Sequence, residues 1–321
     1  MTTEKKEQTQ KQQQVYGGSN YYFDKSDNFG CCLIININKT MKTIGGGHSI
    51  QKFRTGAEAE VKKLQDVFGR STYKTDVIKE EAGKNCVLSE IDKYIEGNCA
   101  KGGCLKTCRV FVCVVLAFGG PGFFYDSKGN RISLSTVVKK FQSCTALQLK
   151  PKLFVVQSCD IDLQPVGKHL FGDVEGRSVQ PLARWPREAD VLIYQSNISG
   201  EYDWHPDLIK HSSLKNQGTP ALRSCTFIKY FCNSMKSLQD EIEKEEEKEK
   251  DPRKAETATI ENMQNYIEFN EVILRTNIKL GKFIKDRMNW DLVDGTWSTV
   301  PRLPVVTDQL AKLLFLPCLY R

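Results

Sequence analysis

The chain has 321 residues, of which 40% are hydrophobic and 26% charged, with a net charge of +7. These fractions are ordinary for a globular protein, and the length can bury one large core or two modest ones. The positive charge is spread along the chain, and neither an RNA-type aromatic motif nor a zinc-finger spacing occurs, so the composition excludes nucleic acid as the expected partner.

The first 20 residues are predicted to be disordered, because a segment rich in Gln and Lys buries little apolar surface. This segment has no apolar centre, so it does not resemble a secretory signal. No apolar run approaches the roughly 20 residues that span a bilayer. A cytoplasmic protein is therefore expected, with reduced cysteines rather than disulfides, with no membrane contact and no cofactor.

Apolar runs alternate with amphipathic segments in the first half of the chain. The run at 109–117 is continuously apolar, as in a parallel strand covered on both faces. The alternation predicts an α/β fold with a mainly parallel sheet. Strands are predicted over residues 31–37, 73–78, 109–117 and 152–157, and helices over residues 55–68, over 88–95 and after Ser133 or Ser135.

Regular structure lapses after the fourth strand, where residues 161–187 carry many Pro and Gly. Later elements are predicted as a strand at 190–195, helices at 222–237 and 262–286, and a strand at 312–316. The charge block at 240–254 is predicted to be solvated or disordered, with an interaction segment as the alternative.

Twelve cysteines invite a metal hypothesis. Cys99, Cys104, Cys108 and Cys113 are clustered, but their gaps are uneven and lack a CxxC pair, so a structural zinc site is disfavoured. Cys113 lies inside the apolar run VFVCVVL, where a free cysteine acts as a small hydrophobe. Core packing is the preferred interpretation, and no metal is expected.

The segment LKPKLFVVQSC ends an apolar strand with Gln157, Ser158 and Cys159. It resembles the strand that carries the nucleophile in the caspase family, whose signature is of the QAC type. FRTGAEAEVKKLQDVF, EADVLIYQSNISGEYDW and VTDQLAKLLFLP resemble further ordered segments of that family. The resemblance spans nearly the whole chain.

A caspase-like fold has a six-stranded, mostly parallel sheet flanked by helices. The resemblance implies a large subunit over residues 21–160, a linker over 161–187, and a small subunit over 188–321 that contains the charge block. The family also forms dimers through an edge strand, which we assign here to residues 312–316. An apolar edge strand left uncovered would otherwise invite aggregation.

The chemistry implied by the family is incomplete in this sequence. Cys159 matches the nucleophile, but Phe118, in LAFGGPG, stands where the family has the histidine that carries the proton. Gly119 persists, and its position matches the oxyanion site. The oxyanion site alone would leave only residual catalysis.

The implied substrate pocket has also changed. Arg54 and Gln157 match residues that bind a substrate aspartate, and Trp204 is kept. His205 replaces a second pocket arginine, and Asp160 replaces the arginine after the nucleophile. An acidic substrate residue would be repelled by Asp160.

These losses predict a caspase-like pseudoenzyme that regulates apoptosis-type proteolysis by dimerising with an active caspase. Self-association and caspase-inhibitor proteins are further partner hypotheses, and an interaction role for the charge block is a third class. The alternative is an active cysteine endopeptidase with altered specificity and a substitute base. The histidines available for that role are His48, His169, His205 and His211, and the candidate linker cleavage sites are Asp160, Asp162 and Asp173.

Overall fold

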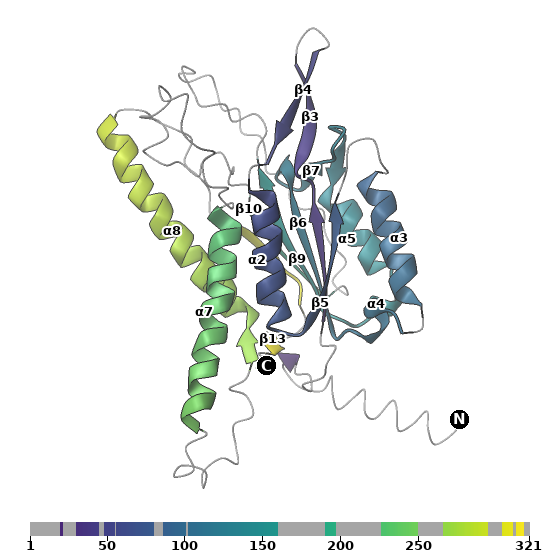
Figure 1. Ribbon diagram of the computed structural model, residues 1–321, viewed down its shortest axis with the longest axis vertical. Helices are drawn as coiled ribbons and strands as arrows, with labels where there is room; N and C mark the ends of the chain where they lie inside the picture. Colours follow the sequence, from purple (N-terminus) through teal and green to yellow (C-terminus); the bar gives the residue numbers. More distant parts are fainter. Residues whose placement is uncertain are drawn as a thin grey trace.

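The structure is a computed structural model of the chain, and it describes residues 20–21, 30–44, 48–54, 56–79, 86–100, 102–159, 190–196, 226–249, 266–294, 304–310 and 313–317. Its centre is one large sheet between two layers of helices (Figure 1). The domain boundaries inferred from the sequence stay predictions, because residues 160–189 lie outside the described part of the chain.

Six strands form the main path of the large sheet, in the order β12-β10-β9-β6-β2-β5. The first five along the chain pair in parallel, and only β12 runs antiparallel to its neighbour. The predicted six-stranded, mostly parallel α/β sheet is therefore confirmed. The strands are β2 (Gly30–Asn36), β5 (Tyr73–Lys79), β6 (Val110–Gly120), β9 (Lys152–Cys159), β10 (Val191–Ser196) and β12 (Val305–Asp308).

Helices cover both faces of the sheet (Figure 1). Residues of β6 alternate between two buried clusters, with Val112 and Val114 in one, and Phe111 and Cys113 in the other. This alternation explains why the strand reads as continuously apolar: each face meets its own helical layer. One layer contains α2 (Ala57–Gly69), α7 (Thr226–Glu249) and α8 (Phe269–Asp294), and the other α3 (Val87–Cys99), α4 (Cys104–Thr107) and α5 (Leu134–Gln142).

Short elements complete the fold, and of these the sequence predicted only the C-terminal strand. A hairpin projects beyond one end of the large sheet (Figure 1) and a second short hairpin extends β6. A third small sheet holds the C-terminal strand. These elements are β3 (Lys39–Ile44) with β4 (His48–Phe53), β7 (Phe123–Tyr125) with β8 (Arg131–Ser133), β1 (Asn20–Tyr21) with β11 (Tyr266–Glu268) and β13 (Leu313–Pro317), and the 3-10 turn η1 (Thr145–Leu147).

The prediction that residues 312–316 form an edge strand of the large sheet is wrong. β13 lies between β1 and β11 in the small sheet, so both of its edges are paired. Leu314 and Leu316 are buried in the cluster beneath α7 and α8. The large sheet has β5 at one edge and β12 at the other, and β12 is shorter and less apolar than β13.

The charge block also differs from its prediction. α7 does not end at Ser237 but continues to Glu249, so the first part of the block is helical. Ile242 is buried, and Arg70, the residue that follows α2, forms ion pairs with Asp240 at 2.8 Å and Glu243 at 3.2 Å. An apolar anchor together with these ion pairs holds this part of the helix against the domain.

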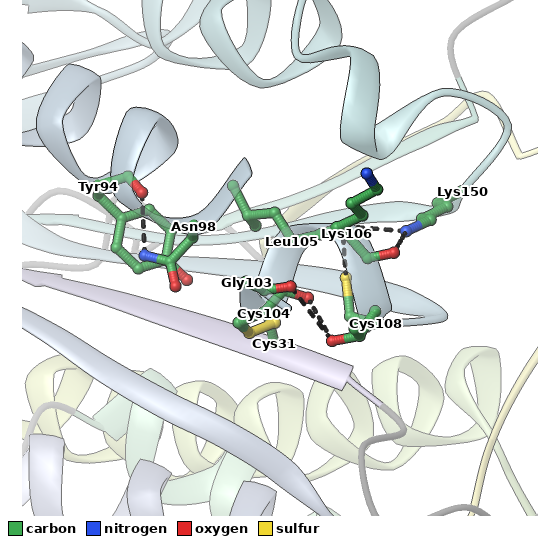
Figure 2. Close-up of a disulfide and its surroundings, with 10 residues drawn as sticks. Cys31, Tyr94, Asn98, Gly103, Cys104, Leu105, Lys106, Cys108 and Lys150 are labelled. Atoms are coloured by element: carbon green, nitrogen blue, oxygen red, sulfur yellow. Dashed lines mark hydrogen bonds between the residues drawn. A yellow bond between two sulfur atoms is a disulfide. The ribbon is translucent and has the colours of Figure 1, made fainter. Parts of the chain in front are cut away.

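The expectation that all cysteines are reduced is wrong for one pair. Cys31 on β2 and Cys104 on α4 form a disulfide, with Cα atoms 6.1 Å apart (Figure 2). Cys104 is thereby removed from the zinc set, and among the described residues no three His, Cys, Asp or Glu side chains gather in a metal-binding geometry. Cys108 and Cys113 are buried, which confirms core packing for both.

Candidate active site

The predicted nucleophile ends a central strand of the sheet. β9 runs from Lys152 to Cys159, and its neighbours β6 and β10 are both parallel to it. Because the carboxyl ends of parallel strands meet at one edge, the last residues of β6, β9 and β10 converge there. Cys159 lies at the edge where open α/β sheets bind ligands.

Phe118 is the residue of β6 in register with Cys159. Its side chain is 4% exposed, so it is part of the packed interior rather than a surface substitution. A phenyl ring has no atom that takes up or releases a proton. The position beside Cys159 on the neighbouring strand therefore supplies no general base.

Close packing against β7 requires glycine at position 119, independently of any role toward a substrate. A Cβ atom at this position would lie 2.4 Å from the carbonyl oxygen of Phe123 and 2.6 Å from the Cα atom of Phe124. β7 turns back against β6 here, and only glycine leaves it room. Retention of Gly119 thus has a steric reason that does not require catalysis.

A buried polar network lies at the same edge, and periodicity gave no sign of it. The Nε2 atom of Gln195 donates hydrogen bonds to the carbonyl oxygen of Gly120 at 3.0 Å and to Oγ of Ser158 at 3.1 Å. The backbone N–H of Gly122 donates to Oε1 of Gln195 at 3.3 Å. The network joins the ends of β9 and β10 to the β6–β7 turn, where Gly122 has a φ of 73°. The available sequence signal was that Ser158 and Gln195 are polar residues at the ends of apolar strands.

The two described residues of the predicted aspartate pocket are buried. Arg54 follows β4, and its guanidinium is ion-paired to Glu60 and donates a hydrogen bond to Oδ1 of Asn36 at 3.2 Å. Gln157 is fully buried on β9, in register with Leu116 and with Ser196. Their roles toward substrate stay predictions.

Several predicted residues lie outside the described part of the chain. This holds for Trp204 and His205 of the substrate loop and for three candidate cleavage sites. Of the histidines proposed as substitute bases, only His48 belongs to a described element, β4. The others outside are Asp160, Asp162, Asp173, His169 and His211.

The fold and this edge define an α/β domain whose cysteine closes a parallel strand. The family model described as Caspase domain matches residues 29–263, which is more than half of the chain. The chain belongs to the caspase family.

Similar proteins agree with that assignment. Caspase-3 of Mus musculus is 28% identical over 197 residues, which cover 59% of this chain and 64% of the mouse protein. Caspase-8 of Mus musculus is 27% identical over 134 residues, covering 40% of this chain and 26% of that protein. The alignments thus span less than two thirds of these relatives. A solved structure described as pro-sf-caspase-1 matches with a TM-score of 0.60 at 18% identity, covering 92% of this chain and 93% of that one, which establishes likeness of fold.

No helix in the described ranges is long and apolar enough to cross a bilayer.

Proposed function

We propose that this chain is a catalytically deficient member of the caspase family that regulates an active caspase by pairing with it. The observation that carries the proposal is the register of Phe118 with Cys159 on adjacent strands. Cysteine proteolysis needs a thiolate, a proton carrier and an oxyanion site. An unassisted thiol, with a pKa near 8.5, is only a few per cent ionised at pH 7.

We expect binding of an acidic substrate to be impaired as well. Arg54 corresponds to a pocket arginine of the family, but here Glu60 of the same chain neutralises its guanidinium. A substrate carboxylate would have to displace that buried partner. The proposal therefore rests on two separate features, one affecting the proton carrier and one affecting recognition.

The open edge of β12 is the surface we assign to pairing. One side of β12 binds β10, and within the described residues no strand pairs with its other side. Val305 is 56% exposed and Val306 is 37% exposed. An edge strand with exposed β-branched residues is a template for a strand from another chain. The occupant we propose is the equivalent edge of an active caspase or of a second copy.

The catalytic part is tested with purified full-length protein, an aspartate-directed substrate panel and a broad peptide library. Cleavage by the wild type is expected to equal that of the Cys159→Ala variant. A Phe118→His variant run beside them shows whether a proton carrier alone restores turnover. Turnover by the wild type that disappears on Cys159→Ala would establish the alternative, an active endopeptidase with a substitute base.

The pairing part is tested by sedimentation of the protein alone and mixed with an active caspase. Val305→Lys is expected to abolish association, because it places a charge on the open strand edge. Leu149→Lys is the matched control, because Leu149 is 70% exposed and precedes β9 rather than lying on β12. Association that survives Val305→Lys, or that Leu149→Lys removes equally, would contradict the role of β12.

A further inference from the structure

Cysteines gather in the cluster on the α3, α4 and α5 side of the sheet. Two of them form the disulfide described above, and four others are thiols that pack in or against the same cluster. The proposed function uses none of them. The six residues are Cys31, Cys99, Cys104, Cys108, Cys113 and Cys144.

Two of the thiols are in contact. The Sγ atoms of Cys99 and Cys144 are 3.0 Å apart, although the residues are 45 positions apart in the chain. Cys99 is the last residue of α3, and Cys144 is the residue that precedes η1. A disulfide has an S–S distance of about 2.05 Å, so bond formation requires a sulfur movement of only about 1 Å.

The backbone on each side of this pair is already held. The N–H of Cys144 donates to the carbonyl oxygen of Phe141 at 3.3 Å, and its own carbonyl accepts from Leu147 at 2.9 Å. Beyond Cys99, the N–H of Gly103 donates to the carbonyl of Ala100 at 2.9 Å. The thiols are therefore brought together by fixed elements, which lowers the entropic cost of joining them.

The chain beyond Cys99 is fixed at α4. The disulfide between Cys31 and Cys104 binds α4 to the sheet, as Figure 2 shows. The Nζ atom of Lys150 donates to the carbonyl oxygens of Leu105 at 3.0 Å and Lys106 at 2.9 Å. At residue 104 the chain is thus anchored by the disulfide to Cys31. At residue 99 it carries a thiol that lies beside the thiol of Cys144.

The two thiols differ in exposure. Cys99 is half-buried, whereas Cys144 is 5% exposed. Burial, and to a lesser degree the hydrogen bond shared with Cys144, raises the pKa of Cys99 to about 11. The Lys150 ammonium opposes this shift. A small reagent reaches Cys99 first, and its reaction is faster in mildly alkaline solution, where more thiolate is present.

We propose that Cys99 and Cys144 are a dithiol site that a small-molecule disulfide, such as oxidised glutathione, converts to a second intramolecular disulfide. The Cys99 thiolate attacks the glutathione disulfide, forming a mixed disulfide and expelling one glutathione thiolate. The Cys144 thiolate then attacks Sγ of Cys99 and expels the second. The protein loses two electrons and two protons, and one oxidised glutathione becomes two reduced glutathione molecules.

The product would join the end of α3 to the segment that follows α5. Together with the existing bond, it would fix the residue 99–104 segment at both of its ends. Because the second disulfide closes a 45-residue span, it restricts the unfolded chain and should raise Tm by several degrees.

The test uses full-length protein incubated with oxidised glutathione at pH 8.5, followed by digestion without reduction and mass spectrometry. We expect a peptide linking Cys99 to Cys144 and a Tm higher than that of the untreated protein. Cys99→Ser should abolish both changes. Cys86→Ser should keep both, because Cys86 is an exposed thiol preceding the other end of α3.

Other outcomes would overturn the proposal. One is a stable glutathione adduct on Cys99 with no disulfide to Cys144. Another is that Cys99 and Cys144 both still react with iodoacetamide in a sample in which glutathione has already modified the exposed Cys86. The linked peptide is sought in the wild-type protein, so its absence there decides against the site even if Cys99→Ser does not fold.

Discussion

The side chains of Arg54 and Glu60 form an ion pair inside the protein, with 4% and 2% of their surfaces exposed. Arg54 lies between β4 and α2, and Glu60 is in the first turns of α2. Asn36, the last residue of β2, accepts a further hydrogen bond from the guanidinium at 3.2 Å. The pair therefore links α2 to the carboxyl edge of the parallel strands.

We predict that Glu60→Gln strongly destabilises the protein. The substitution removes the negative charge of this buried ion pair, and removal of one member of such a pair typically costs about 3–5 kcal/mol. The free energy of unfolding, measured in denaturant, should fall by that amount.

A neighbouring glutamate on the same helix provides the control. Glu58 is ion-paired to Lys79 at 2.9 Å, but both side chains are more than half exposed. Glu58→Gln should therefore change the free energy of unfolding by less than about 1 kcal/mol. Equal effects of the two substitutions would show that the Arg54–Glu60 pair is not buried as described.

The second prediction concerns the β6–β7 turn. Gly119→Ala places a Cβ atom 2.4 Å from the carbonyl oxygen of Phe123, so the hairpin must shift, at a cost of about 1–3 kcal/mol or more. Gly69→Ala, at the end of α2, meets no atom within 4 Å and should be neutral or stabilising. Thermal unfolding of both variants checks the contrast, which would be lost if β7 did not pack on Gly119.

Apolar run length predicted the central strands because those strands are buried on both faces. The same signal misplaced the edge strand. Leu314 and Leu316 are the more apolar pair because they are buried in β13, whereas Val305 and Val306 lie on the exposed edge strand β12. Run length measures burial, and the edge of a sheet is its least buried part.

The candidate site divides in the same way. The resemblance to the caspase family singled out Cys159 and Phe118 in the sequence, and the parallel pairing of β6 and β9 places them in register. The hydrogen-bond and ion-pair partners of Arg54 and Gln195 could not be predicted from the sequence, because they depend on tertiary contacts between different segments of the chain. The pairing of Cys31 with Cys104 belongs to this second group, since spacing alone does not determine disulfide connectivity.

The third prediction is that reduction of the Cys31–Cys104 disulfide lowers stability. The bond closes a span of 73 residues, for which the loss of chain entropy on cross-linking corresponds to about 4 kcal/mol. The free energy of unfolding should fall by about this amount in a strong reductant. A Cys104→Ser variant should no longer respond to reductant, and a wild type that does not respond would mean that the bond is absent in solution.

The last prediction concerns the decrease in the free energy of unfolding at alkaline pH. Burial raises the pKa of the Cys108 thiol from 9.0 to about 11, with the nearby Lys150 ammonium opposing the shift. Between these two values the unfolded chain has released the proton and the folded chain retains it, so stability falls as pH rises. This contribution to stability is fully present below pH 9. About 2 kcal/mol of it is lost by pH 11, and the loss levels off at about 3 kcal/mol at higher pH.

Cys108→Ala should therefore lose about 2 kcal/mol less stability than the wild type between pH 9 and pH 11. The slopes are compared rather than the absolute values, because the substitution also changes packing in a side chain that is only 2% exposed. Cys86→Ala, at an exposed thiol, controls for the loss of one cysteine. Parallel slopes for the wild type and Cys108→Ala would mean that Cys108 releases its proton as easily in the folded protein as in the unfolded chain.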